Sequence, residues 1–116
     1  MTFPFLQVTT ADVTTDGRIA KIRGRVTNPY DETVEGIRYL VLIGSPTGSN
    51  GARELDRIKS ESAATIEPHG WTPLRLDVTS MYFGLRGSTP FVVVAFAKKI
   101  GGRDVAIPGS VQWSGN

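Results

Sequence analysis

The stretch from Gly24 to Ile43 restricts the possible fold more than any other part of the chain. It consists of two extended segments separated by a short polar segment. Asn28-Pro29 ends the first segment, because proline fixes φ and disfavours helical backbone at the residue before it. In the second segment, apolar residues recur at every second position from Ile37 to Ile43, which is the period of a strand with one buried face. This pattern predicts a β-hairpin and therefore a protein built on β-sheet.

Similar extended patterns, bounded by glycine, proline and other turn residues, recur along the rest of the chain. The predicted strands cover residues 6–14, 18–27, 34–43, 52–66, 71–80, 90–100 and 105–113. Residues 90–100 are apolar on both phases, as in a central strand that is covered on both faces. No long amphipathic helix accompanies these strands. The spacing predicts an all-β fold, a single antiparallel immunoglobulin-like β-sandwich of about seven strands.

One predicted strand has an alternative. Within residues 52–62, Leu55 and Ile58 stand three positions apart among charged residues, a spacing that also suits a helix. Residues 63–66 continue in an extended pattern. We therefore favour an edge strand whose charges discourage pairing with the edges of other sheets.

Local irregularities add detail to this plan. The apolar positions change phase between Val8 and Ala11, which indicates a bulge or a change of strand partner. Gly24 lies inside a strand, where glycine is expected if another segment packs closely over the backbone. Residues 44–51 form either a surface loop or a binding loop, but they lack the Gly-Lys-Ser/Thr ending of a phosphate-binding loop. Residues 81–87 are expected to form a crossover or a short helical turn.

Length and charge exclude several classes of protein. The 116 residues are expected to form one domain, 1–116, with residues 1–5 as a loose N-terminal arm and 114–116 as a tail. Because the chain has no cysteine, it has no disulfide, thiol chemistry or thiolate metal site. The net charge of +2 comes from 13 basic and 11 acidic residues that interleave along the chain, a pattern that argues against nucleic-acid binding.

Targeting signals are also missing from the sequence. No stretch reaches the roughly 20 apolar residues that span a bilayer, and residues 1–5 do not resemble a signal peptide. We expect a periplasmic or other extracytoplasmic location if the chain is a trimmed domain whose leader or anchor was removed. Otherwise we expect the cytoplasm.

The residues do not form a catalytic pattern. His69 is the only histidine and lies in a Pro-x-Gly turn, so we interpret it as an exposed turn residue. A nucleophilic serine would need this imidazole as its base, and a histidine metal site would need further ligands. The acidic residues that could pair in a glycoside hydrolase are better explained as turn or surface charges: Asp31, Glu32, Asp56, Glu61 and Asp77. The sequence therefore predicts no enzyme activity, no catalytic residue, no cofactor and no metal.

A basic row and three aromatic residues could bind a ligand. Lys21, Arg23 and Arg25 alternate along one strand, and their row could extend to Arg38 on the neighbouring strand. They form either a solvated face paired with Glu35 or Asp77, or a docking surface for an anionic partner, a polysaccharide or a lipid headgroup. The aromatics could add stacking but could equally pack in the core or at its rim. The possible binding surface comprises Lys21, Arg23, Arg25, Arg38, Trp71, Tyr82 and Trp113.

Between Ala20 and Val78 the chain resembles a known type of module. The motifs are Gly24-x-Val26-x-Asn28, then Gly36-Ile37-x-Tyr39-x-Val41, then Ile66-x-Pro68-x-Gly70 before a strand. They resemble the FxLYD-type module and related immunoglobulin-like envelope domains. The resemblance implies a non-enzymatic, extracytoplasmic bacterial module without catalytic residues.

These observations lead to two hypotheses about function. The first is a structural or protein-interaction module, part of a bacterial envelope or secreted assembly, which binds a protein partner or itself through a strand edge. It predicts an exposed strand edge or apolar patch. The second is a carbohydrate- or anion-binding module, which predicts exposed aromatic platforms or a basic row without acidic partners. The sequence does not identify a small-molecule ligand for either.

Overall fold

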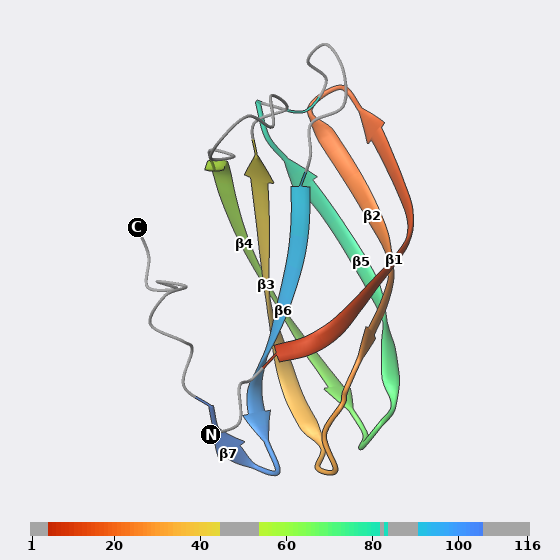
Figure 1. Cartoon of the computed structure of the whole chain (residues 1–116), viewed down its shortest axis with the longest axis vertical. Coiled ribbons are helices and arrows are strands. Elements are labelled where there is room, and N and C mark those ends of the chain that lie inside the picture. The colour runs from red at the N-terminus through yellow and green to blue at the C-terminus, as the bar shows by residue number, and fades with distance from the viewer. Residues whose placement is uncertain (1–4, 45–53, 82, 84–90, 106–116) are drawn as a thin grey trace.

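The computed structural model describes residues 5–44, 54–81, 83 and 91–105, which form an all-β protein (Figure 1). Strands make up 78% of the described residues, and none of these residues is helical. The strands are β1 (Phe5–Asp16), β2 (Ile19–Thr27), β3 (Val34–Gly44), β4 (Glu54–Ile66), β5 (Trp71–Thr79), β6 (Phe91–Ile100) and β7 (Arg103–Asp104). The prediction of an all-β, antiparallel fold is therefore confirmed. Within this described part, no helix could cross a membrane.

The strands form a sheet that nearly closes into a barrel. They follow the order β4-β3-β6-β1-β2-β5, with β7 also paired to β6, and every pairing is antiparallel. One part of the sheet contains β3, β4, β6 and β7, and the other contains β1, β2 and β5. They are joined where Phe5 and Leu6 pair with Phe96 and Ala95. In Figure 1, β1 starts beside β6 and then runs along β2.

The core combines inward-facing side chains from both parts of the sheet. Along β5 the burial alternates, with Leu74, Leu76 and Val78 buried and their neighbours more exposed. The core residues that are completely buried include Ala20, Ile22, Val26, Val34, Ile37, Val41, Ile43, Ala95 and Ala97. Burying a valine, leucine or isoleucine side chain contributes about 1.5–3 kcal/mol relative to exposure. The period-2 pattern in the sequence thus reflects one continuous core.

The predicted hairpin over residues 24–43 is wrong. Strand β2 pairs with β1 and β5, whereas β3 pairs with β4 and β6. The polar segment between β2 and β3 therefore connects the two parts of the sheet and does not turn the chain back onto its own strand. The alternation identified both strands correctly, but it carries no information about which strands pair.

Asn28 ties the crossing connection to the turn between β4 and β5. Its side chain is buried, and Nδ2 lies 2.8 to 3.1 Å from the main-chain oxygens of Glu32, Ile66 and Glu67. Its Oδ1 accepts a hydrogen bond from the main-chain N–H of Tyr30 at 2.8 Å. These bonds hold the β2–β3 connection against the turn between β4 and β5. Tyr30 and Glu32 belong to the connection itself, whereas Ile66 and Glu67 lie at the end of β4 and in the turn that follows, so leaving these two buried contacts unmade would be costly.

The irregularities expected near Val8 and Gly24 are confirmed. Strand β1 pairs first with β6 and then with β2, and its register with β2 shifts between Thr10 and Asp12. A Cβ at Gly24 would overlap the main-chain oxygen of Thr9. The backbone of β1 thus lies directly over this glycine.

The outcome for the other predicted strands is mixed. The strand interpretation of residues 54–62 is confirmed, because β4 is an edge strand of the sheet. Strand β6 lies inside the strand order, but it is covered on both faces only in part, since Val92 is 51% exposed. The glycines at 101 and 102 have positive φ and turn the chain into β7. Most of the strand predicted over 105–113, and most of the segment 81–87, lie outside the described residues.

Candidate functional site

The sheet has an opening between β6 and β1. The two strands pair only at Phe5–Leu6. Within the described part of the chain, β1 pairs with β2 alone from Gln7 onward, and Phe91–Val94 of β6 pair with β3 alone. Beyond their short contact, the two strands therefore present edges with no other described strand between them (Figure 1).

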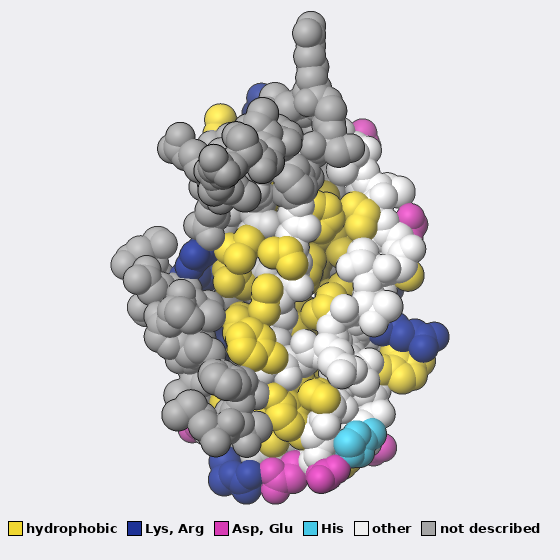
Figure 2. All heavy atoms as spheres, in the orientation of Figure 1, with side chains coloured by type: hydrophobic (Ala, Val, Ile, Leu, Met, Phe, Trp, Pro, Cys, Tyr) yellow, Lys and Arg dark blue, Asp and Glu magenta, His cyan; other side chains and the backbone are white. Residues whose placement is uncertain are grey.

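Apolar side chains line this opening. Val92 on β6 and Val13 on β1 are 51% and 37% exposed. Val8, Phe91 and Val93 are partly buried and pack against the core. Figure 2 shows hydrophobic side chains gathered on the face that carries β6 and β1. A concentration of apolar side chains on a surface is typical of interaction sites.

The two end strands of the sheet are protected against further pairing. Strand β4 carries Arg57, Lys59 and Glu61, and its register with β3 is irregular opposite Gly36. Strand β5 contains Pro73, which has no main-chain donor. Charges, irregular pairing and proline are the features by which natural sheets avoid edge-to-edge association.

The β6 edge lacks these protections. Phe91–Val94 contain no charge and no proline, and they pair with β3 without a register shift. Among the edges that the structure describes, this one is suited to accept another strand. The sequence does not predict this edge, because an open edge depends on which strands pair. The sequence does contain a relevant pattern, because β6 is apolar at successive positions. Val92 and Val94, which alternate with the residues that pack against the core, are apolar as well.

A small cavity of about 340 Å³ lies between the end strands β4 and β5. Its lining includes the hydroxyl-bearing side chains of Tyr39, Ser60, Ser62 and Thr72. Burial raises the pKa of Tyr39 above its ordinary value of 10.0. The phenol is therefore neutral at physiological pH, and the lining hydroxyls are suited to contact water.

The predicted basic row is solvated and partly neutralised. Lys21, Arg23 and Arg25 share the outer face of β2, opposite the buried side chains. Arg23 forms an ion pair of 2.9 Å with Asp77 on β5, as the cross-strand interpretation predicts. Glu35 takes no part in it, because it lies on β3, which does not pair with β2.

Arg38 does not extend the basic row, and that part of the prediction is wrong. It lies on β3, where its Nε is 3.6 Å from Glu61 of β4. Lys98 of β6 approaches the same carboxylate at 2.9 Å. The hydrogen bond from Lys98, aided by the positive charges of Lys98 and Arg38, lowers the pKa of Glu61 below its ordinary value of 4.5. Arg38 thus belongs to a separate charge cluster in the other part of the sheet.

Of the three predicted aromatic residues, the structure describes one. Trp71 is 53% exposed at the start of β5. The guanidinium of Arg25 lies 4.2 Å from the centroid of its ring, which is a cation–π contact. Tyr82 and Trp113 lie outside the described residues. The structure therefore brings together two members of the predicted surface, Arg25 and Trp71.

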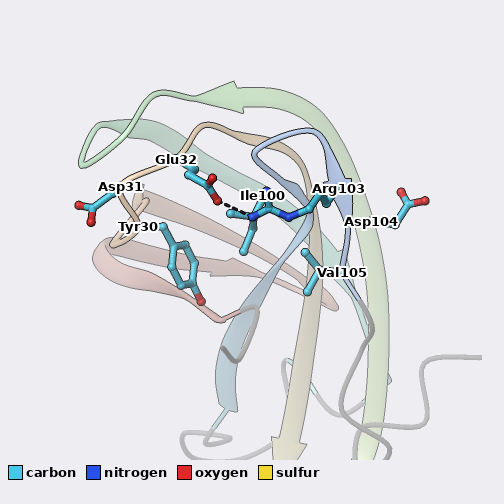
Figure 3. A pocket seen from close by; sticks show the side chains of 7 residues that line it. All are labelled: Tyr30, Asp31, Glu32, Ile100, Arg103, Asp104 and Val105. Atoms are coloured by element: carbon cyan, nitrogen blue, oxygen red, sulfur yellow. Dashed lines mark hydrogen bonds and ion pairs between the residues drawn. The ribbon is translucent and has the colours of Figure 1, made fainter. Parts of the chain in front are cut away.

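His69 lies in an exposed turn, as expected, and its Nε2 is 2.6 Å from Oδ1 of Asp31. A pocket of about 620 Å³ opens nearby, lined by Tyr30, Asp31, Glu32, Ile100, Arg103, Asp104 and Val105. Glu32 accepts a hydrogen bond of 2.6 Å from Arg103, while the carboxylates of Asp31 and Asp104 point away on opposite sides (Figure 3). Among the described residues, no three potential ligands are grouped to hold a metal ion.

Comparison with known proteins identifies no family for this chain. No model of a known protein family matches the chain, and no curated protein matches it in sequence. The resemblance to FxLYD-type modules stays a hypothesis. Two of its motifs do meet in the structure, because Asn28 bonds to the main chain at Ile66.

Proposed function

We propose that this protein is a non-enzymatic protein-interaction module that binds an extended segment of a partner as an added strand on β6. The observation that supports this proposal is the unprotected apolar edge Phe91–Val94, which faces no strand of the described chain on its β1 side. In strand addition, main-chain hydrogen bonds provide affinity and pockets for alternate side chains provide specificity. The opening between β6 and β1 offers both.

The lining of the opening defines the kind of partner segment. Every second side chain of an added strand would point toward the core, where Phe91 and Val93 are only partly buried. The others would lie beside Val92 on the outer face. Successive side chains of a strand point to opposite faces, so we expect a partner segment with apolar residues on at least one phase.

The immunoglobulin-like sandwich belongs to this proposal as the finer description of the fold. In immunoglobulin domains the first, second and fifth of the main strands share one sheet, and the third, sixth and seventh share the other. The grouping of β1, β2 and β5 against β3, β6 and β7 supports this assignment. Strand β4 departs from it, because the fourth strand of the constant-type domain belongs to the first sheet, whereas β4 pairs with β3. Together with the FxLYD-like motifs, the grouping of the other strands favours a module of a bacterial envelope or secreted assembly.

The test is a selection of short random peptides displayed on phage against the immobilised chain of 116 residues. We expect selected peptides to shift the amide NMR signals of Phe91–Val94 and of the facing part of β1. Val92→Lys should weaken their binding about tenfold or more, since a charge would enter an apolar interface. The matched control is Met81→Lys, at an apolar residue that is 65% exposed elsewhere, and it should leave binding unchanged.

Two results would reject the proposal. One is that no peptide is enriched, and the other is that the selected peptides bind Val92→Lys as well as the unaltered chain. Mapping of the bound peptides to β4 or β5 would also reject it, because those edges carry the protective residues described above.

The exposed Trp71 favours a second candidate function, carbohydrate binding. Arg25 holds the indole in place, and an exposed indole can stack on a sugar ring as it does on other flat apolar surfaces. If this function holds, oligosaccharides should quench the tryptophan fluorescence of the chain but not that of Trp71→Ala. Unchanged fluorescence in the unaltered chain would exclude it.

A further inference from the structure

The inner face of β4 carries small and polar side chains in its middle part. Ser60 and Ser62 pair with Tyr39 and Ile37 of β3, whose side chains belong to the core. Directly opposite residues of an antiparallel pair share one face of the sheet, so both serines point inward. Small side chains at these positions leave unfilled the space that becomes the cavity between β4 and β5.

The hydroxyl of Tyr39 reaches this cavity without a partner. Tyr39 is 4% exposed and lines the cavity. Among the described residues, none forms a hydrogen bond with its hydroxyl, and the oxygen is not sealed from solvent. Leaving a buried hydroxyl unbonded is unfavourable, so we expect a group inside the cavity to bond to it.

The cavity is a short slot that is bounded at both ends. At one end, the turn over residues 67–70 joins β4 to β5. At the other end, the hydroxyl of Ser80 donates a hydrogen bond of 2.7 Å to Oδ2 of Asp56, which ties the end of β5 to the start of β4. Pro73 in the wall of the slot has no main-chain donor for an added strand. The slot therefore suits a compact ligand and not an extended segment.

The lining of the slot combines hydroxyl groups with apolar surface. The hydroxyl groups belong to Tyr39, Ser60, Ser62 and Thr72. Each hydroxyl can both donate and accept a hydrogen bond, so together they match a ligand whose own groups are hydroxyls. Leu76 adds apolar surface, which suits the C–H groups on the face of a sugar ring. The volume of about 340 Å³ is near the lower limit for ligand pockets, which is roughly 300 Å³.

The charges of the described lining come from Glu61 and Arg75, which have opposite signs. This balance favours a neutral ligand over an anion or a cation. We propose that the slot between β4 and β5 binds one neutral sugar ring, with the hydroxyl of Tyr39 bonded to a ligand oxygen. The slot lies between the two end strands of the sheet, so this binding does not depend on strand addition at β6. It also differs from stacking on Trp71, which would hold a sugar on the outer surface.

Titration with glucose, galactose and mannose, followed by the amide NMR signals of the chain, tests this site. We expect at least one of these sugars to shift the signals of Ser60, Ser62 and Thr72. Tyr39→Phe removes only the hydroxyl and should weaken the binding about tenfold. It should leave the free energy of unfolding unchanged, because that hydroxyl has no partner to lose within the described chain.

The matched control is Tyr30→Phe, the same chemical change at a hydroxyl that donates to the main-chain oxygen of Phe5 at 2.9 Å. This control should lower the free energy of unfolding, since it removes a hydrogen bond, and should leave sugar binding unchanged. An equal loss of stability in Tyr39→Phe would overturn the proposal, because the hydroxyl would then already have a partner in the protein.

Three further results would overturn the proposal. One is that none of the three sugars shifts the signals of the slot, and another is that Tyr39→Phe binds sugar as well as the unaltered chain. The third is that sugars quench the fluorescence of Trp71 without shifting the slot signals, since the sugar would then lie on the indole. Peptides selected as described above should bind Tyr39→Phe normally, so failure of the β6 edge and failure of the slot are observed separately.

Discussion

The Nδ2 atom of Asn28 lies 3.1 Å from the main-chain oxygen of Ile66, and both residues are buried. This bond joins the connection between β2 and β3 to the end of β4. The oxygen of Ile66 is one of three main-chain oxygens within hydrogen-bonding distance of this amide nitrogen, the others being those of Glu32 and Glu67. The Asn28 side chain thus ties this connection to the turn after β4, together with the main-chain bonds from Asn28 N–H to the oxygen of Gly70 at 2.9 Å and from His69 N–H to the oxygen of Tyr30 at 3.3 Å.

Asn28→Ala should destabilise the protein strongly. The substitution leaves buried main-chain oxygens without a donor, and each unsatisfied group costs about 1–3 kcal/mol. We expect the free energy of unfolding to fall by about 3 kcal/mol, measured by urea denaturation. The control Gln7→Ala alters an exposed residue of β1 and should stay within about 0.5 kcal/mol of the unaltered chain. Equal effects of the two substitutions would contradict the role of Asn28.

Gly24→Ala should be more damaging than the same change at Gly17. A methyl group at Gly24 would overlap the backbone of Thr9, whereas Gly17 has no atom within 4 Å of its added Cβ. At Gly24 we expect a loss of about 2–3 kcal/mol, since β1 must move away. Gly17 has a φ of 62°, so alanine there should cost about 1 kcal/mol through backbone strain. Thermal unfolding of both variants checks the order, and a reversed order would refute the close packing.

Arg25→Ala should have a small but measurable effect. The contact of its guanidinium with Trp71 is exposed to solvent, and such cation–π contacts contribute about 0.5–1 kcal/mol. We also expect the tryptophan fluorescence spectrum to change, because the cation no longer covers the indole. The control is Lys21→Ala on the same strand face. If the two variants have identical spectra, the contact does not persist in solution.

Glu61 should make stability depend on pH. Its pKa is lowered in the folded protein, chiefly by the hydrogen bond from Lys98. A carboxyl with a lowered pKa stabilises the fold above its unfolded pKa, which is near its ordinary value of 4.5, and loses this contribution as the pH falls through the folded pKa. We therefore expect Glu61→Gln to be less stable than the unaltered chain at pH 7, with a difference that shrinks in acid.

Urea denaturation between neutral and acidic pH measures this difference. The variant Glu67→Gln makes the same change in net charge and serves as the control. A difference between Glu61→Gln and the unaltered chain that stays constant across the acidic range would show that the carboxylate is not stabilised by Lys98. High salt should reduce the effect, because the charges are exposed and screened.

The sequence predicted the elements that depend on neighbouring residues. The strand over 71–80, the irregularity of β1 near Val8 and the close packing at Gly24 follow from alternation and from the steric limits of glycine. The preference for a strand over a helix in residues 54–62 was also correct. Each of these features can be inferred within one segment, and this is why the pattern was sufficient.

Strand pairing was harder to predict, because it depends on contacts between distant segments. The prediction of a hairpin over 24–43 was wrong because the path of the polar segment involves a contact between Asn28 and Ile66. The alternation of apolar residues does not encode this contact. For the same reason, the sequence could not show that Arg38 lies apart from the basic row or that the edge at Phe91–Val94 is open. Both features depend on which strands pair. By contrast, the exposure of His69 followed from its turn alone.

The junction at Phe5 and Leu6 has a mechanical consequence. Two residue pairs join β1 to β6, whereas nine join β1 to β2. A tensile load applied at the N-terminus would reach the short junction first. The molecule would then yield by detaching β1 from β6 while the longer pairing with β2 still held.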